Sequence, residues 1–213
     1  MQAEQPIKTF EVSTSPHQKH YRGFVLLFFA ALFLLTSGGR INSGDAGTQL
    51  QAAMLLANTG HLGTSLPPGV NGNSDTGLWV KSLGGLYYQC HDIGNICLMF
   101  PAAWLSSRLS HASPDQKILN PPILARLGVA WTYALFSALG TYFVFRLFAL
   151  VYSVRIAFLL SLLFSTGTIF WAYTKSAWDV TGASIGVAML CYFAYKLLLY
   201  AAQPAPLEAR SAG

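Results

Sequence analysis

Two acidic side chains, Asp45 and Asp179, stand close to long uncharged stretches of this sequence. A carboxylate in such a place can act as a general base that takes a proton from an attacking hydroxyl group. Either residue could instead only stabilise a helix start. Asp45 can serve as the N-cap of a following helix, and Asp179 can interact favourably with the dipole of the helix that it begins. The residues alone leave both interpretations open.

Other polar side chains near these acids could bind a ligand. His91 and Asp92 are adjacent titratable groups that follow two tyrosines, although such a pair is also typical of a solvated turn or cap. Lysine and arginine donors recognise phosphate groups, including those of lipid-linked sugars. Four cations are expected near the membrane plane, where each alone is typical of a lipid head-group anchor: Arg40, Lys81, Arg126 and Lys175.

Motifs of soluble enzymes are absent from the sequence. Its three cysteines, Cys90, Cys97 and Cys191, form no CxxC pair and have no histidine at zinc-like spacing. A disulfide between Cys90 and Cys97 requires a non-helical intervening chain, because residues seven apart in a helix are about 10 Å apart. We therefore expect free thiols. No P-loop, GxSxG, HExxH or GxGxxG motif occurs.

The composition is that of a membrane protein. Of 213 residues, 53% are hydrophobic and only 10% are charged, whereas a soluble domain is about 25% charged. The mean hydropathy is +0.44, the net charge is +5 and the pI is near 9.2. The basic residues lie between apolar runs rather than on one stripe, which argues against nucleic-acid binding and for contact with membrane lipids.

Four apolar stretches, uncharged except for Lys196 in the last, are long enough to cross a bilayer. A helix of about 20 residues, rising about 1.5 Å per residue, matches a hydrocarbon core about 30 Å thick. We therefore predict an all-α integral membrane protein with four transmembrane helices. A cleaved signal peptide is the alternative for the first, but the basic N-terminal tail and weak cleavage site favour an uncleaved anchor. The predicted spans are residues 23–39, 127–145, 156–174 and 180–202.

The basic flanks predict the orientation. Basic residues close to the ends of spans favour the cytoplasmic side. They place the N-terminal tail (1–22), the turn between the second and third spans and the C-terminal tail (203–213) in the cytoplasm. The long loop 40–123 and the short turn 175–179 then lie outside. The expected location is the plasma (inner) membrane, with Asp45 and Asp179 on the exterior face.

The exterior loop is too long to be structureless. Apolar residues at helical spacing predict an amphipathic helix over 46–58, with Gly60 placed to end it. Turn-forming residues over 61–85 predict an irregular loop. The apolar stretch 93–105 is short and contains Pro101, which favours a second interfacial helix. The alternative is a fifth span, which would reverse the orientation of everything after it.

The order of these features resembles the GT-C-fold membrane glycosyltransferases that use polyprenyl-phosphate sugars. Protein O-mannosyltransferases and the lipid A aminoarabinose transferase belong to this group. The first exterior loop of the family is similar to Ser43-Gly44-Asp45 and Asn58-Thr59-Gly60-His61-Leu62. The entry into its second helix is similar to Gly85-Leu86-Tyr87-Tyr88-Gln89-Cys90-His91-Asp92-Ile93-Gly94 and Leu98-Met99-Phe100-Pro101. The second exterior loop is similar to Phe170-Trp171-Ala172-Tyr173-Thr174-Lys175-Ser176-Ala177-Trp178-Asp179, so that the resemblance covers about residues 22–200.

The resemblance implies a site and an activity in the cell envelope. In the family the first-loop acid is the catalytic carboxylate, which corresponds to Asp45. The second-loop acid corresponds to Asp179, which supports catalysis in some members and binds a divalent metal in others. The implied donor is a lipid-linked sugar; the cofactor is unknown, with a divalent metal as the one that the resemblance suggests. We expect the substrates to be bound by Arg40, Tyr88, His91 and Lys175.

The chain also departs from the family. Members often carry two adjacent acids in the first loop, whereas Ala46 follows Asp45 here. Members usually have eight or more spans, and residues 23–202 contain four predicted ones. The resemblance therefore covers the N-terminal portion of the GT-C membrane domain, and three alternatives stay open: an N-terminal fragment of a longer enzyme, a split subunit whose partner chain supplies further helices, or a degenerate copy. Two other hypotheses remain: a protein that binds or transports lipid-linked sugars without chemistry, and a structural membrane subunit.

Overall fold

The computed structural model describes residues 16–38, 41, 44–65, 79–90, 93–174 and 179–202, with the side chains of 16–20, 174, 179 and 180 left aside. Within these residues the chain forms eight helices and one two-stranded hairpin. The prediction of a mainly helical protein is confirmed. The hairpin was not predicted.

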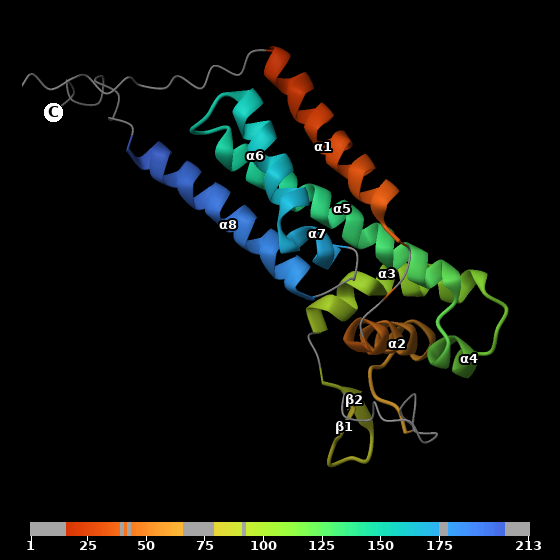
Figure 1. Ribbon diagram of the computed structural model, residues 1–213. Coiled ribbons are helices and arrows are strands. Elements are labelled where there is room, and N and C mark those ends of the chain that lie inside the picture. Colours follow the sequence, from red (N-terminus) through yellow and green to blue (C-terminus); the bar gives the residue numbers. More distant parts are fainter. Residues whose placement is uncertain are drawn as a thin grey trace, which may run out of the picture.

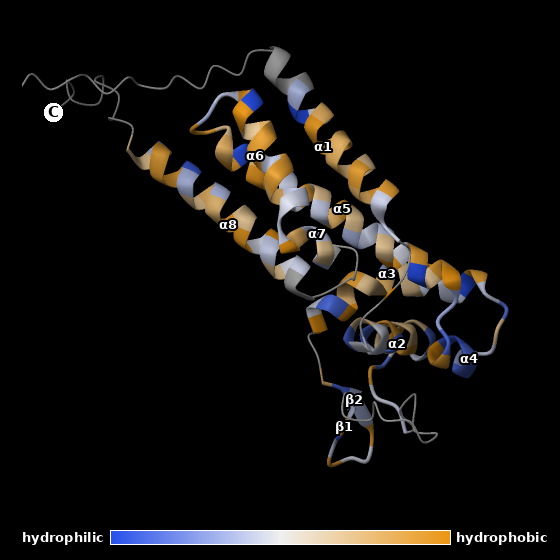
Figure 2. Cartoon of the chain, in the orientation of Figure 1, coloured by the Kyte–Doolittle hydropathy of each residue, from blue (hydrophilic) through white to orange (hydrophobic). Residues whose placement is uncertain are grey.

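Four long helices make up a bundle: α1 (Pro16–Thr36), α5 (Ile123–Phe148), α6 (Val154–Gly167) and α8 (Asp179–Ala201). α5 is central, because it packs against each of the other three. Figure 2 shows these helices mostly in the orange of apolar residues, with apolar side chains also on their outer surfaces. α2 (Gly44–Thr59), α3 (Ile93–Leu109) and α4 (Pro114–Leu119) gather at one end of the bundle (Figure 1).

Two of the bundle helices are long and apolar enough to cross a membrane. They are α5 and the part of α8 from Thr181 to Ala201. The apolar parts of the other two, Tyr21–Thr36 in α1 and Val154–Gly167 in α6, are shorter. α1 ends at Thr36, and the Thr36 hydroxyl donates to the carbonyl of Leu32 at 2.7 Å.

The third predicted span, 156–174, is not one helix. α6 ends at Gly167, Thr168 is extended, and a separate helix, α7, runs over Ile169–Thr174. The Thr168 hydroxyl stabilises the break from both sides. It donates to the carbonyl of Phe164 at 2.7 Å and accepts from the backbone N–H of Phe170 at 3.2 Å. A threonine that satisfies backbone groups in this way competes with a continuous helix.

The predicted amphipathic helix over 46–58 is confirmed as α2, but its start differs from the prediction. The helix begins at Gly44, so Asp45 lies inside its first turn and is not its N-cap. Its end is as predicted. Gly60 adopts a φ of 81°, and its N–H donates to the carbonyl of Leu56 at 2.9 Å. Glycine adopts this left-handed conformation without a steric cost, which is why it commonly ends helices.

The prediction of an irregular loop over 61–85 is wrong at its end. β1 (Trp79–Lys81) pairs in antiparallel fashion with β2 (Tyr87–Gln89). Thr64 extends this pairing on the other side of β2, through two backbone hydrogen bonds with Tyr87 of 3.0 and 2.8 Å. Aromatic and β-branched residues such as Trp79 and Val80 favour strands. The hairpin turn is closed by Gly85, whose φ is 84°.

The second helix predicted in the long loop is longer than expected. α3 continues through Pro101 to Leu109. Pro101 lies on the exposed side of the helix. α3 packs against α2 and α5, and it is not one of the two helices long and apolar enough to span. The alternative of a fifth span at 93–105 therefore gains no support.

Candidate functional site

The first half of α3 holds the start of α2 in place. The side-chain amide of Asn95 donates a hydrogen bond to the side-chain carbonyl of Gln49. Both residues are buried, at 4% and 2% exposure. Gln49 follows Asp45 by four residues, so the two lie one turn apart on the same face of α2. The buried amide pair therefore fastens the turn that carries Asp45 to α3.

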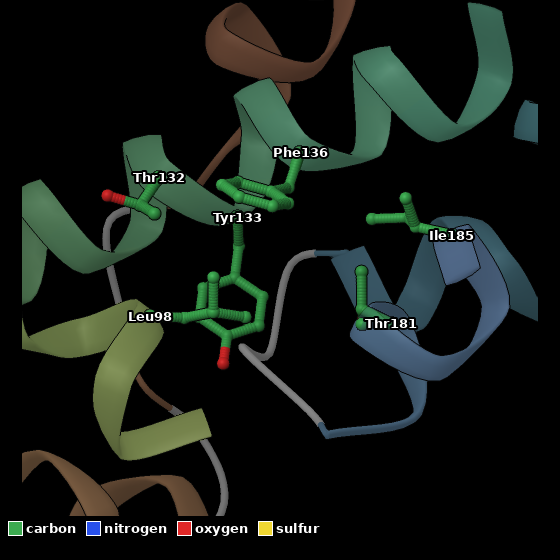
Figure 3. A pocket seen from close by; sticks show the side chains of 7 residues that line it. Leu98, Thr132, Tyr133, Phe136, Thr181 and Ile185 are labelled. Atoms are coloured by element: carbon green, nitrogen blue, oxygen red, sulfur yellow. The ribbon is translucent and has the colours of Figure 1, made fainter. Parts of the chain in front are cut away.

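The start of α8 packs on the same part of α3. A Cβ atom added to Gly182 would lie 3.8 Å from the Leu98 side chain, and Leu98 follows Asn95 by three residues. Figure 3 shows Tyr133 pointing from α5 into the space between Leu98 of α3 and Thr181 of α8. Tyr133 and Thr181 are buried, at 2% and 1% exposure. The first halves of α3 and α5 and the start of α8 thus come together here.

These contacts bring the starts of α2 and α8 to one helix. Asp45 lies one turn from the Gln49–Asn95 contact, and Asp179 begins the helix whose fourth residue, Gly182, meets Leu98. Asp45 is exposed, as a base that meets an external substrate must be, and its backbone carbonyl accepts from the Thr48 hydroxyl at 2.9 Å. Two carboxylate-bearing helix starts therefore flank the first half of α3.

Tyr88 lies at a cavity beside the same segment. The cavity has a volume of about 80 Å³. Its lining residues come from α2, the segment that follows it, the hairpin and α3: Ala52, Leu62, Tyr88, Gln89, Ile93 and Ile96. The Tyr88 ring covers Gly63, where an added Cβ would meet the ring at 2.9 Å. Tyr88 is 42% exposed, so a ligand could reach its ring and hydroxyl.

Three predicted binding residues, Arg40, His91 and Lys175, lie outside the described residues. Asp179 is described only as the first residue of α8. The two other cations that were predicted near the membrane plane make local contacts. Lys81 lies over the Tyr87 ring at 5.6 Å, and Arg126 donates to the carbonyl of Pro121 at 3.0 Å.

The described part of the chain contains no group of three histidine, cysteine or acidic side chains that could hold a metal ion. Cys97 and Cys191 are exposed free thiols, as predicted, and Cys90 is also exposed. α3 begins at Ile93, so only Cys97 of the first pair lies in a helix.

Lys117 has a structural role that the sequence did not suggest. Its ammonium group is buried and donates to the carbonyl of Ser107, in the last turn of α3, at 2.8 Å. A cation at a helix C-terminus satisfies a free carbonyl and interacts favourably with the dipole. α4 thereby fixes the far end of α3. A lysine in a polar loop is ordinarily solvated, so only the fold reveals this contact.

The buried amide pair leads to a stability prediction. Gln49→Leu should lower the free energy of unfolding by about 1–3 kcal/mol, because the Asn95 amide would stay buried without its partner. Thermal or denaturant unfolding in detergent measures this change. The double variant Gln49→Leu/Asn95→Leu should recover part of the loss, since no polar group is then stranded. If the double variant loses as much free energy of unfolding as the two single variants together, the pair does not have this role.

No protein-family model matches the chain, and no curated protein or solved structure is significantly similar to it. The arrangement of Asp45 and Asp179 around α3 is therefore the main structural basis for a functional proposal. The chemistry open to this arrangement is that of an exposed carboxylate, Asp45, at one end of an apolar helix bundle.

Proposed function

We propose that the chain is a membrane glycosyltransferase, or the N-terminal half of one, which transfers a sugar from a polyprenyl-phosphate carrier to an acceptor outside the cytoplasm. The observation that supports this best is that α2, whose first turn carries Asp45, and α8, which begins at Asp179, each have a contact near their start with the first half of α3, at one end of the bundle. There a lipid-embedded donor and a water-borne acceptor can meet. The sequence resemblance to GT-C enzymes supports the same reaction.

The proposed reaction uses Asp45 as the base. The carboxylate takes the proton of an acceptor hydroxyl as its oxygen forms a bond to the anomeric carbon. The bond from that carbon to the phosphate oxygen breaks, and the electron pair leaves with the lipid phosphate. Cations stabilise the departing charge, a role that we assign to Arg40 and Lys175. A single displacement of this kind inverts the anomeric centre. Asp179 supports the site or holds a divalent metal.

The membrane arrangement is part of the proposal. We place α1, α5, α6 with α7, and α8 across the plasma membrane, with α2 and α3 at the exterior interface. α5 has 26 residues and extends about 39 Å. It is therefore long enough to cross a hydrocarbon core about 30 Å thick. Much of the apolar surface of α8 is exposed, with Leu190 at 68% and Leu197 at 67%. That surface suits lipid or the helices of a partner chain.

Cysteine labelling of whole cells tests this arrangement. In a background with the three native cysteines replaced by serine, Leu83→Cys at the exposed hairpin turn should react with a membrane-impermeant maleimide. Ser153→Cys, in the exposed turn between α5 and α6, should react only after the membrane is permeabilised. Labelling of position 153 but not 83 in intact cells would contradict the orientation.

A protein that binds or transports lipid-linked sugars without chemistry is the alternative. It would use the same bundle and the same cavity at Tyr88 but would not need a carboxylate base. Sugar transfer from a polyprenyl-phosphate donor by the purified protein in liposomes separates the two functions. Product formation supports the transferase, whereas carrier binding without product supports the alternative.

A further inference from the structure

Arg146 occupies an unusual setting in the last turn of α5. Its guanidinium group donates to the hydroxyl of Tyr142, one turn earlier on α5, at 3.0 Å. It also donates to the hydroxyl of Tyr192, on α8, at 2.5 Å. The carbon at its centre lies over both rings, 5.7 Å from the Tyr142 centroid and 5.1 Å from that of Tyr192. Two aromatic rings and two hydroxyls thus hold one cation.

The hydrogen bonds within this cluster use only some of its N–H and O–H donors. Arginine carries five N–H donors, and only two of its contacts here are hydrogen bonds to protein. Each tyrosine hydroxyl that accepts from Arg146 keeps its own hydrogen for donation, and within the described residues neither has a protein acceptor. In the same part of the chain no carboxylate pairs with Arg146. The cluster therefore presents a positive charge and several donors, which are the requirements for binding an anion.

Its position suits the head groups of a lipid leaflet. Arg146 follows Arg126 by 20 residues along α5, a rise of about 30 Å, which matches the hydrocarbon thickness of a bilayer. It lies at the end of α5 away from α2 and α3 (Figure 1). Lys196 follows Tyr192 by four residues, so a second cation lies one turn further along α8 on the same face.

We propose that Arg146, Tyr142 and Tyr192 form a binding site for the phosphate group of an anionic phospholipid in the cytoplasmic leaflet. The Arg146 guanidinium and the Tyr142 hydroxyl donate to the phosphate oxygens, while Tyr192, which is buried at 4% exposure, holds the guanidinium in place from α8. The lipid tails lie along the exposed apolar surface of α8. The site joins α5 to α8, so a bound lipid stabilises the contact between these helices. This binding does not depend on the proposed transferase activity.

The test measures lipid binding to the full chain in a neutral detergent. Phosphatidylglycerol should raise the thermal unfolding midpoint of the wild type in a saturable way, and phosphatidylcholine should do so much less. Arg146→Gln should weaken the apparent affinity for phosphatidylglycerol by about 10-fold or more, because a charge-assisted hydrogen bond to phosphate is lost. Arg155→Gln, which removes an exposed cation at the same end of the bundle, is the matched control and should change affinity less than about 2-fold.

Variants of the two tyrosines distinguish an effect on lipid binding from an effect on helix packing. Tyr142→Phe/Tyr192→Phe keeps both rings over Arg146 and removes only the hydroxyls, so it should fold and still bind phosphatidylglycerol more weakly. This variant keeps the test decisive if Arg146→Gln does not fold. Equal affinity in the double variant and the wild type, or an equal loss in Arg155→Gln, would overturn the site. Stabilisation by soluble glycerol phosphate without lipid would show that the site binds free phosphate rather than a membrane lipid.

Discussion

Asp45→Asn is expected to lower the rate of sugar transfer by about 100-fold or more, the scale for loss of a general base. The change is nearly isosteric and removes only the charge. Because Asp45 is exposed in the first turn of α2, the loss of its interaction with the helix dipole costs only about 0.3–1 kcal/mol. Transfer from a polyprenyl-phosphate donor in liposomes, normalised to folded protein, measures the effect.

A control for this change is present in α4. Asp115 is another exposed acid in the first turn of a helix in the same layer. Asp115→Asn should leave transfer unchanged, and Asp179→Asn should have a smaller or metal-dependent effect than Asp45→Asn. Full transfer by Asp45→Asn, or equal losses in Asp45→Asn and Asp115→Asn, would remove Asp45 from the chemistry. Asp45 would then only stabilise the start of α2.

Gly140→Ala is expected to cause a large loss of stability. A Cβ atom at Gly140 in α5 would lie 2.6 Å from Cγ1 of Ile185 in α8, with the Ile185 backbone close behind at 3.6 Å. The two helices would have to separate, and overpacking of this kind costs about 1–3 kcal/mol. Unfolding in detergent measures the loss. α5 is the centre of the bundle, so aggregation of the protein should also increase.

Gly186→Ala provides the comparison. It is also a glycine in a bundle helix, but an added Cβ meets nothing within 4 Å. Alanine favours helix over glycine by about 1 kcal/mol, so this variant should be as stable as the wild type or more stable. If Gly140→Ala is also stabilising, the close packing of α5 on α8 is wrong.

The sequence predicted the elements whose signals are local. Apolar spacing located α2, and Gly60 marked its end because only glycine adopts that backbone conformation freely. The break at Thr168 was missed, since 156–174 is uncharged throughout and the break depends on one hydroxyl that bonds to backbone groups on both sides. The hairpin was missed because each strand has three residues, too few for a clear alternation.

The candidate site was predictable only in part. The charges flanking the apolar stretches predicted that Asp45 and Asp179 begin helices at one end of the protein. The contacts that fix those helices could not be predicted. Gln49 and Asn95 have side chains that are usually solvated, and their burial depends on how α2 crosses α3. Arg146 was predicted as a basic flank, but its two tyrosine partners include one from α8 that is 46 residues away in sequence.

The most direct test of the proposed function is a transfer assay with the wild-type chain. Purified protein in liposomes, alone and together with any chain that co-purifies with it, would be supplied with a radiolabelled polyprenyl-phosphate sugar and an acceptor mixture from the cell envelope. The proposal predicts a labelled product with an inverted anomeric centre, formed only when Asp45 is intact. Saturable binding of the carrier without any labelled product, in both preparations, would contradict it.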